Sequence, residues 1–366
     1  MSKLVTLNDL GYVNRGRSKH RPRNAPELYG GPYPFVQTAD IKHADLYLTE
    51  YEQTYSEFGL EQSRLWPTGT LCITIAANIA DTAILGCDAC FPDSVIGFIP
   101  DDEKCDVRYV KYLFDTQLQT TFKQLSQGVA QDNLSKNKLL SIKFCVPDLP
   151  SQRQIADVLS AYDDLIENNR RRIAILEETA RLTYRKWFSN VSEQKEWRIC
   201  KVADVLDTFH RPPKVPKELY IQEGEYPCID QGKDFVGGYT NDMNAVVDRV
   251  PAIVFGDHTR VLKYLSCPFA CGADGTQLLF AKKGCLTQEY LYFALKEIDL
   301  TNYFYARHFK ILKSKSILVP PYYLVEEFSN QVRDNMDMIG TLRDYNVKLA
   351  SARDMLLPRL MKGESV

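Results

Sequence analysis

The stretch that decides the fold is residues 151–188, SQRQIADVLSAYDDLIENNRRRIAILEETARLTYRKWF, which contains neither Gly nor Pro. Its stripe positions recur at steps of three and four residues, which places them on one face of an α-helix. They are Ile155, Leu159, Tyr162, Ile166, Ile173, Leu176, Ala180 and Thr183, closing on Trp187. Ser151 is a reasonable N-cap. Asn169 interrupts the stripe, where it either fixes the helix register or faces solvent. We therefore predict one helix over 151–188.

A second stretch, from Tyr322 to Leu357, repeats this pattern and stops at Pro358. Its stripe positions are Phe328, Val332, Ile339, Leu342, Tyr345, Leu349 and Leu356. At 1.5 Å per residue, each helix would be about 50–57 Å long. A single apolar stripe on so long a helix needs a partner. We expect the two helices to form an antiparallel pair about a pseudo-twofold axis; the alternative is that each packs only on its own globular body.

The chain is also an internal repeat. The segment 33–36, Tyr-Pro-Phe-Val, recurs at 226–229 as Tyr-Pro-Cys-Ile, and 141–147 recurs at 314–320 with an offset of 173. Beyond the second anchor the offset holds without a gap, whereas the segments between the anchors scarcely match. Two bodies that differ in sequence, each followed by a helical segment of matching length, suggest similar tasks performed on different targets.

The bodies contain short β-rich runs between helical segments, with Gly- and Pro-rich turns. The β-rich runs are 71–75, 94–99, 252–255 and 316–319, and the helical segments are 108–125 and 287–296. We predict an α/β (α+β) fold in which two domains with mixed sheets are separated by the long antiparallel helices. The predicted boundaries are 1–150 and 191–321 for the two bodies, and 151–190 and 322–366 for the helices.

Composition is that of an ordinary folded protein. The 366 residues are 45% hydrophobic and 25% charged, with a net charge of −2, which excludes disorder and collagen. No apolar run is long enough to span a membrane, and the first residues lack a secretory signal. We expect a cytoplasmic protein whose ten cysteines are reduced, mostly buried thiols.

Catalytic motifs are missing. The chain has no phosphate-binding loop, no Gly-rich S-adenosylmethionine loop and no nucleophile elbow. Val319-Pro-Pro-Tyr322 is similar to the Asp/Asn-Pro-Pro-Tyr motif of amino-methyltransferases, but Val319 cannot accept a hydrogen bond from the target amine. Cys87 and Cys90 could form half of a zinc knuckle, but no second pair follows at the usual spacing. We expect no catalytic residue, metal or cofactor in this chain.

Recognition chemistry is present instead. Arg15, Arg17, Lys19, Arg21 and Arg23 crowd into nine residues together with one histidine, as in an exposed cationic loop that contacts phosphates or enters a DNA groove. The other interpretation is a solvated surface loop.

Polar loops at matching positions precede the repeated strand in both halves. The first contains Gln131 and Asn133, and the second contains Tyr305, Arg307, His308 and Lys310. Gln and Asn read adenine edges, Arg reads guanine, and Lys holds phosphate. A DNA-reading role is therefore plausible; the alternative is an ordinary polar hairpin.

These residues resemble a known family. Segments 146–170, 176–188 and 352–364 are similar to the central and C-terminal conserved regions of type I restriction–modification specificity subunits. Tyr33–Asp40, with Gln37 and Thr38, and Phe255–Arg260, with His258 and Arg260, look like segments of that family's target-recognition domains. The resemblance covers nearly the whole chain, including the order of the repeat.

The resemblance implies a non-catalytic subunit whose two target-recognition domains each read half of a bipartite double-stranded DNA site. The helices would set the gap between half-sites, at most about 15 base pairs for a 50 Å spacer, and dock two methyltransferase subunits. Those partners carry S-adenosylmethionine and methylate adenine, and motor-nuclease subunits with ATP and Mg²⁺ join them to cut foreign DNA. The residues that we assign to partner docking are Gln152, Arg153, Ile155, Trp187, Phe188, Leu356 and Arg359. The second helix begins Val325-Glu-Glu327 where the first has Gln152-Arg-Gln154, so the two partner contacts need not be equal.

Two other classes stay open from the sequence. A self-contained methyltransferase or nuclease would need a cofactor loop that this sequence lacks. A non-catalytic adaptor that assembles proteins without reading DNA would fit the near-neutral net charge of −2.

Overall fold

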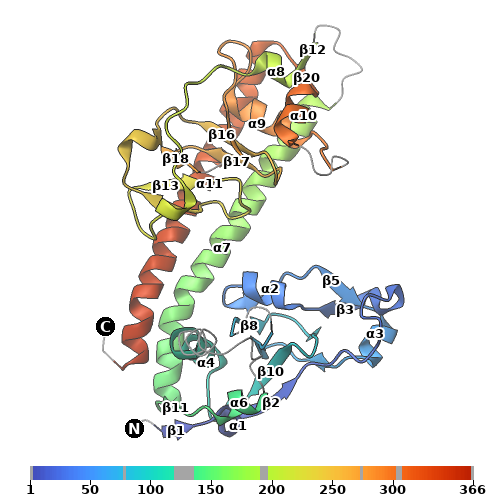
Figure 1. The fold of residues 1–366 in the computed structure, drawn as a ribbon, viewed down its shortest axis with the longest axis vertical. Coiled ribbons are helices and arrows are strands. Elements are labelled where there is room, and N and C mark those ends of the chain that lie inside the picture. Colours follow the sequence, from blue (N-terminus) through green and yellow to red (C-terminus); the bar gives the residue numbers. More distant parts are fainter. Residues whose placement is uncertain are drawn as a thin grey trace. The chain divides into compact units, whose positions relative to one another are not determined.

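The computed structural model describes residues 3–76, 80–118, 136–189, 197–272, 275–301 and 307–363. The chain divides into unit 1, which is Met1–Glu167 with Asn346–Val366, and unit 2, which is Asn168–Tyr345. Both divisions fall inside the long helices, so each unit contains half of each helix. In Figure 1 the blue and cyan strands belong to unit 1, and the yellow and orange strands to unit 2.

Unit 1 contains two main sheets. The strands of the larger sheet are β2 (Gly11–Arg15), β4 (Tyr47–Leu48), β7 (Leu71–Thr74), β8 (Thr82–Leu85) and β10 (Val95–Pro100). They pair in the order β2-β10-β7-β8-β4. The strands of the smaller sheet are β3 (Tyr29–Phe35), β5 (Gln53–Tyr55), β6 (Leu65–Trp66) and β9 (Ala89–Cys90), in the order β5-β3-β9-β6. Every residue of β7 and β8 is buried, so both strands are covered on both faces, which explains the apolar run at 71–75.

Unit 2 also contains two main sheets. The strands β16 (Ala252–Gly256), β17 (Leu262–Leu265) and β19 (Thr276–Leu279) pair in the order β17-β16-β19. The strands β13 (Tyr226–Ile229), β14 (Gly238–Thr240), β15 (Val246–Val247) and β18 (Phe269–Cys271) pair in the order β14-β13-β18-β15.

The four-stranded sheets of the two units have the same topology. β3 pairs antiparallel with β5 and parallel with β9, and β13 pairs in the same way with β14 and β18. The outer strands β6 and β15 each run antiparallel to the strand beside them. The parallel pairs join Phe35 to Cys90 and Cys228 to Ala270. This common pairing confirms the internal repeat predicted from the sequence.

A two-stranded antiparallel ribbon precedes each long helix. In unit 1 it is made of β1 (Lys3–Val5) and β11 (Phe144–Val146), and in unit 2 of β12 (Arg198–Lys201) and β20 (Ser316–Val319). The registers are equivalent, because Leu4 pairs with Cys145 and Ile199 pairs with Leu318, which is 173 positions after Cys145.

The two long helices are α7 (Leu149–Phe188) and α11 (Tyr322–Met361). The helix α7 begins two residues before Ser151, the cap predicted from the sequence. Asp148 performs that task instead, since its Oδ1 accepts the Ser151 amide at 3.0 Å. The helix α11 continues past Pro358, where the sequence predicted its end. A proline this close to the last turn removes only one hydrogen bond of the helix. No helix in the described ranges is long and apolar enough to cross a membrane.

Within each unit the halves of α7 and α11 pack antiparallel, as the sequence predicted. In unit 1 the Asn346 side-chain amide donates to the Ile166 carbonyl at 3.4 Å. In unit 2 the Arg343 guanidinium pairs with Glu177 at 2.7 Å. Asn169, which interrupts the stripe of α7, is buried.

Shorter helices complete both units. In unit 1 they are α1 (Leu7–Leu10), α2 (Thr38–His43), α3 (Glu57–Glu61), α4 (Val107–Leu113), α6 (Lys136–Ser141), the 3-10 turn Pro26–Leu28 and the π-helical turn Phe114–Leu118. In unit 2 they are α8 (Val202–Val205), α9 (Gln288–Lys296), α10 (His308–Ser314) and the 3-10 turns Lys217–Leu219 and Met243–Ala245. The predicted helix at 108–125 thus corresponds to α4 and the π-helical turn, and its last residues lie outside the described ranges.

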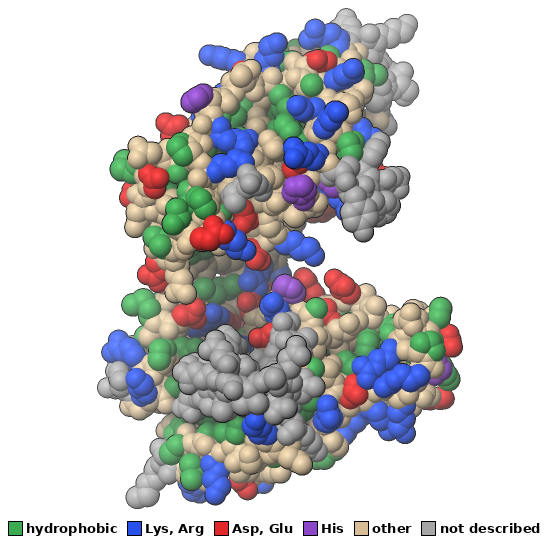
Figure 2. Space-filling view, viewed as in Figure 1, with side chains coloured by type: hydrophobic (Ala, Val, Ile, Leu, Met, Phe, Trp, Pro, Cys, Tyr) green, Lys and Arg blue, Asp and Glu red, His purple; other side chains and the backbone are tan. Residues whose placement is uncertain are grey.

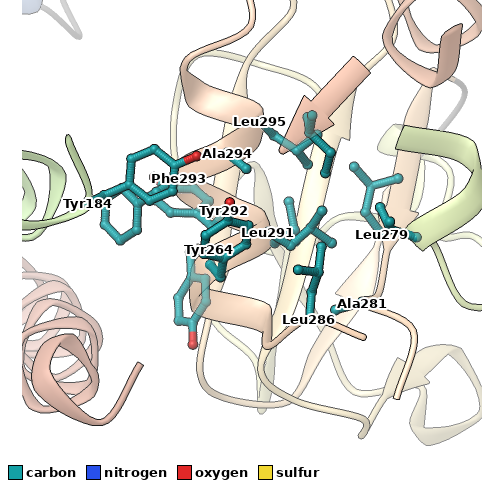
Figure 3. Packing of buried hydrophobic residues seen from close by; sticks show 14 of the residues in the cluster. Tyr184, Tyr264, Leu279, Ala281, Leu286, Leu291, Tyr292, Phe293, Ala294 and Leu295 are labelled. Atoms are coloured by element: carbon teal, nitrogen blue, oxygen red, sulfur yellow. The ribbon is translucent and has the colours of Figure 1, made fainter. Parts of the chain in front are cut away.

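Each helix pair shares the core of its unit. In unit 2, α9 lies between the three-stranded sheet and the long helices, and Tyr184 of α7 contacts Tyr290 and Phe293 of α9 with ring centroids 5.4 and 6.1 Å apart. Figure 3 shows Tyr184 reaching toward Tyr292 and Phe293 while Leu291 and Leu295 face the sheet side. The predicted α/β architecture with long helices is therefore confirmed, and both stripes are covered by bodies as well as by each other.

Candidate nucleic-acid interface

The cationic loop of unit 1 follows β2, and its backbone is held against the segment that runs from the end of β9 to the start of β10. The amides of Gly16 and Arg17 donate to the carbonyls of Val95 and Phe91 at 2.8 and 3.0 Å. All five of its predicted contact residues are exposed, so the loop presents a fixed cationic surface. Figure 2 shows Lys and Arg side chains gathered on the part of unit 1 that contains β3, β5 and α3.

Backbone carbonyls position most of the loop's arginines. Arg21 Nη1 donates to the carbonyls of Ser18 and His20 at 2.8 and 2.7 Å. Arg17 Nη2 donates to the Ser63 carbonyl, and Ser63 Oγ donates back to the Arg17 carbonyl at 2.8 Å. Lys19 is fixed through its amide, which donates to the Gln62 carbonyl at 3.1 Å.

Gln37 and Thr38 lie beside this loop. Gln37 caps α2, its amide donates to Asp40 Oδ2 at 2.7 Å, and its Nε2 donates to Gln53 Oε1 at 2.6 Å. A cavity of about 190 Å³ is lined by Arg23, Gln37 and Thr38, with Tyr29, Phe35 and Tyr55 among its other walls. The structure therefore brings together the cationic loop and the polar turn after β3, which the sequence treated as separate candidates.

In unit 2 the turn 256–260 is built around Gln231. The His258 amide donates to Gln231 Oε1 at 3.1 Å, and Thr259 Oγ1 donates to the Gln231 carbonyl at 2.5 Å. The turn closes where the Gly256 amide donates to the Val261 carbonyl at 2.8 Å. Gln231 follows β13 as Thr38 follows β3, so the repeat places a polar side chain at the same strand end in both units.

Asp257 joins that turn to α10. Its carbonyl accepts the His308 amide at 3.1 Å and lies 2.8 Å from His308 Nδ1, and its carboxylate accepts the Phe309 amide at 2.7 Å. His308 is buried, which corrects its assignment as a direct DNA contact: its ring holds the turn. Arg307 and Lys310 are exposed beside it.

Arg260 has a separate environment. Its Nη1 donates to the Leu300 carbonyl at 3.0 Å, and its side chain lines a cavity of about 490 Å³ with Arg185 and Lys296. Arg260 therefore binds the segment that follows α9 as well as belonging to the 256–260 turn. The remaining candidates, Gln131, Asn133 and Tyr305, lie outside the described residues.

The sequence reasoning missed a second cationic loop. It follows β12 and α8 in unit 2 and contains His210, Arg211, Lys214 and Lys217. Arg211 Nη1 donates to the Thr276 carbonyl at 2.9 Å. The signal was available, because the buried pair Leu7 and Leu10 recurs as Val202 and Val205, and aligning these pairs superposes the two loops.

The two cationic loops are attached at equivalent points. The Arg17 amide donates to the Phe91 carbonyl and the Val215 amide donates to the Cys271 carbonyl, each at 3.0 Å. Phe91 stands one residue after Cys90, the parallel partner of Phe35, and Cys271 stands one residue after Ala270, the parallel partner of the aligned Cys228. Each unit therefore carries a cationic loop at the same strand end as a polar turn.

Lys263, a buried lysine of unit 2, holds the segment that carries Gln231. Lys263 Nζ donates to the carbonyls of Asp230, Asp234 and Phe235 at 2.9, 2.5 and 3.3 Å. Burial lowers the pKa of Lys263 below its usual value. The ammonium therefore serves to fix the segment after β13 that carries Gln231.

The residues assigned to partner docking divide into two groups. Gln152 and Phe188 are buried, which corrects their assignment, because a partner cannot reach them. Gln152 ties α7 to the loop before α4: its Nε2 donates to the Pro147 carbonyl at 3.0 Å and its Oε1 accepts the Asp106 amide at 3.2 Å. The side chains that pack partly against the cores are Ile155, Leu356 and Trp187. Arg153 and Arg359 are exposed.

Within the described ranges, no group of three His, Cys, Asp or Glu side chains could hold a metal ion. Cys87 is half-buried and Cys90 is buried at the end of β9.

This chain is similar in sequence and in fold to known proteins. A family model described as the type I restriction modification DNA specificity domain matches residues 2–178. The type I restriction enzyme MjaIX specificity subunit of Methanocaldococcus jannaschii is 23% identical over 401 residues, covering 98% of this chain and 92% of that protein. The MjaVIII specificity subunit of the same organism is 28% identical over 118 residues, covering 31% of this chain and 28% of that protein.

A solved structure has the same fold. The crystal structure of the type I restriction–modification system S subunit from M. genitalium aligns with a TM-score of 0.59 at 16% sequence identity. The alignment covers 98% of this chain and 96% of that one.

Proposed function

Because this chain belongs to the family of type I restriction–modification specificity subunits, we propose that it selects the DNA sequence for a modification complex and that each unit reads one half of a bipartite site. The observation that carries this proposal is the repeated pairing of a cationic loop with a polar turn. Both loops are attached at aligned residues, because the Arg17 amide donates to the Phe91 carbonyl in unit 1 and the Val215 amide donates to the Cys271 carbonyl in unit 2.

The two parts of each pairing suit different parts of DNA. Arginine and lysine side chains on a rigid loop neutralise phosphates, which supplies affinity without sequence information. Side-chain amides such as those of Gln37 and Gln231 can donate to and accept from the edge of a base, which supplies specificity. Both amides have their rotamers fixed by hydrogen bonds to Gln53 and His258, respectively. A fixed amide loses little entropy when it binds.

The long helices supply the surfaces for partner proteins. Exposed apolar side chains recur at the repeat offset of 173: Leu165 matches Met338, and Leu182 matches Met355. Each unit thus contains one member of each pair. Equivalent apolar positions on both units are what two copies of one partner require, so we assign them to two methyltransferase subunits.

The chemistry then belongs to the partners. In this proposal the methyltransferase subunits carry S-adenosylmethionine and methylate adenine, and motor-nuclease subunits that bind ATP and Mg²⁺ add restriction. The chain itself contributes recognition and positioning.

Co-purification with the methyltransferase subunit whose gene accompanies the gene for this chain tests this function. The chain is expressed with that protein, the complex is weighed, and methyladenine in host DNA is mapped by single-molecule sequencing. An assembly of two methyltransferases and one specificity chain, with methylation at one interrupted motif, is expected. A complex without any methylated motif would indicate an adaptor that assembles proteins without reading DNA, and would overturn the proposal.

The docking surface can be tested in the same assembly. Leu165→Arg should reduce the bound methyltransferase from two copies to one, and Leu165→Arg with Met338→Arg should remove both. Gln154→Arg, which adds the same charge at an exposed position of α7, should leave two copies bound. Equal losses in the control and the test variant would show that charge alone disrupts the complex.

A further inference from the structure

One acidic residue holds both ends of the cationic loop in unit 1. The Asp93 carboxylate accepts two hydrogen bonds from Arg23 Nη2, at 2.9 Å to Oδ1 and 3.1 Å to Oδ2. The Asp93 carbonyl accepts Arg15 Nε at 3.0 Å. A residue 78 positions from Arg15 and 70 positions from Arg23 in sequence therefore fixes the first and last arginines of this loop.

The contact lies at the cavity that the loop shares with the polar turn. The neighbours of Asp93 in sequence, Pro92 and Ser94, line the cavity together with Arg23 and Gln37. The backbone of Arg23 is fixed as well, because its carbonyl accepts the Tyr29 hydroxyl at 2.6 Å. Arg23 is thus held at its backbone and at one nitrogen of its guanidinium.

Such a contact costs the loop some of its attraction for phosphates. The side chains of Arg23 and Asp93 are 49% and 45% exposed, and an exposed ion pair adds little to stability. The carboxylate nevertheless places a negative charge where a loop that served only phosphates would have none. The pair is therefore better explained by the geometry that it imposes on Arg23 than by the stability that it supplies.

We propose that Asp93 is a positioning residue that makes Arg23 a reader of guanine instead of a phosphate contact. Guanidinium has five N–H donors. Asp93 engages those on Nη2, so Nη1, at the tip of the side chain, can donate to a base acceptor through a single nitrogen. Guanine presents two adjacent acceptors, O6 and N7, in the major groove, and arginine is their commonest partner. This inference rests on the proposed function, and it assigns a guanine to the half-site that unit 1 reads.

In sequence, the residue of unit 2 that the repeat aligns with Asp93 is Ala273, which lies outside the described residues. Arg211 of the second loop donates instead to the Thr276 carbonyl and to Gln277 Oε1. Among the described residues, the second loop is therefore held by different groups from those that hold the first.

The test measures binding of the complex with its methyltransferase to two duplexes, one with the methylated motif and one with that motif scrambled, over a series of salt concentrations. Asp93→Asn should weaken binding to the motif by about fivefold or more. It should tighten binding to the scrambled duplex and steepen its salt dependence by about one unit in log–log slope, because Arg23 becomes a phosphate contact. Changes of opposite sign on the two duplexes cannot come from a loss of folding.

Three further variants complete the experiment. Asp88→Asn is the matched control, since Asp88 is an exposed aspartate of unit 1 bound to Thr68, and it should leave the ratio of the two affinities unchanged. Asp93→Glu should restore part of the preference for the motif. In an Arg23→Ala background, Asp93→Asn should have no further effect on the motif, because the residue that it positions is gone.

The alternatives give different results. Equal tightening on both duplexes would make Asp93 a general brake on DNA binding, and equal weakening would make it structural; each outcome overturns the inference. So would a unit 1 half-site without guanine. If the unmodified complex binds both duplexes equally, the proposed function itself fails.

Discussion

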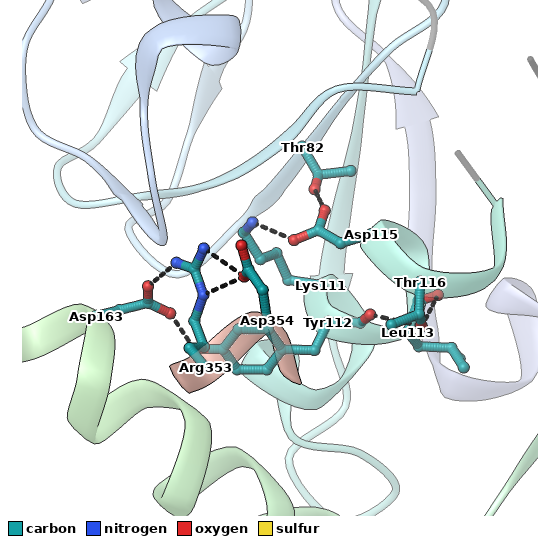
Figure 4. A network of polar contacts seen from close by, with 9 residues as sticks. All are labelled: Thr82, Lys111, Tyr112, Leu113, Asp115, Thr116, Asp163, Arg353 and Asp354. Carbon is teal, nitrogen blue, oxygen red and sulfur yellow. Dashed lines mark hydrogen bonds and ion pairs between the residues drawn. The ribbon is translucent and has the colours of Figure 1, made fainter. Parts of the chain in front are cut away.

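Arg353 on α11 pairs with Asp163 on α7 inside unit 1, although 190 positions separate them in sequence (Figure 4). Asp163 is buried, and its second oxygen accepts the Tyr112 hydroxyl from α4. Burial, followed by the charge of Asp163, raises the pKa of Tyr112, which keeps the phenol a neutral donor. One carboxylate therefore joins three helices of this unit.

Unit 2 fills the same positions with apolar side chains. The 173 offset aligns Met336 of unit 2 with Asp163 of unit 1, and Ala180 with Arg353. When the N-cap residues of α4 and α9, Asp106 and Thr287, are aligned, Tyr112 corresponds to Phe293. Met336, Ala180 and Phe293 are all buried. The same helix junction is therefore polar in one unit and apolar in the other.

We predict that Asp163→Ala lowers the free energy of unfolding of the chain by about 3–5 kcal/mol, since it leaves a largely buried guanidinium without its charge partner. Urea denaturation followed by circular dichroism measures this loss. The triple variant Tyr112→Phe, Asp163→Met and Arg353→Ala copies the unit 2 junction and should recover most of the stability. A triple variant as unstable as Asp163→Ala would show that the two junctions are not equivalent.

Arg307 stands exposed beside the turn that Asp257 and His308 fix. Arg307→Ala should weaken binding to the motif by about 1–3 kcal/mol if this arginine reads a base. Fluorescence anisotropy with the motif and a scrambled duplex measures the effect, and Lys283→Ala, which removes an exposed cation elsewhere in unit 2, is the control. An equal loss on both duplexes would demote Arg307 to a phosphate contact.

Gly275 makes room for Gln231. It has a positive φ of 86°, and a Cβ there would lie 2.6 Å from both polar atoms of the Gln231 amide. Gly275→Ala should therefore displace this amide and relax the sequence preference at the half-site of unit 2, with the half-site of unit 1 unchanged. Methylome sequencing of cells that express the variant distinguishes the two half-sites. Relaxation of both would mean that the substitution disturbs the whole complex.

The Lys263 ammonium donates hydrogen bonds to three backbone carbonyls of the segment after β13. Lys263→Met leaves the carbonyls of Asp230, Asp234 and Phe235 without their donor, and we expect it to lower the free energy of unfolding by about 2–4 kcal/mol. Thermal denaturation measures the loss. Lys233→Met, an exposed lysine on the same segment, should change stability little.

Buried thiols make the protein sensitive to alkaline pH. Burial raises the pKa of Cys228 from 9.0 to about 11 and that of Cys105 to about 12. A folded pKa above the unfolded one gives a contribution to stability that is present below pH 9 and is lost as pH rises toward 11. Denaturation at pH 8 and pH 10.5 should show this loss, and Cys228→Ala should reduce it. A thiol reagent at pH 8 should modify the exposed Cys145 before any buried cysteine.

The sequence predicts the fold of this protein better than it predicts the residues of the candidate site. The long helices, the repeat and the strand positions all follow from local patterns, because a stripe at 3.6-residue spacing or a run of β-branched residues reports its own burial. The helix ends were less accurate, since Asp148 and Pro358 act through single contacts that periodicity does not contain.

Tertiary structure decided which candidate residues could act. His308, Gln152 and Phe188 have the residue types of contact sites, yet packing buries them, and residue type alone does not reveal burial. The meeting of Arg23 with Gln37 and its fixation by Asp93 join segments far apart in the chain. The sequence determined that this is a repeated scaffold without catalytic motifs, because repeats and periodicity are local. Only the fold decided which charges meet, because contacts between distant segments are set by sheet pairing and helix packing.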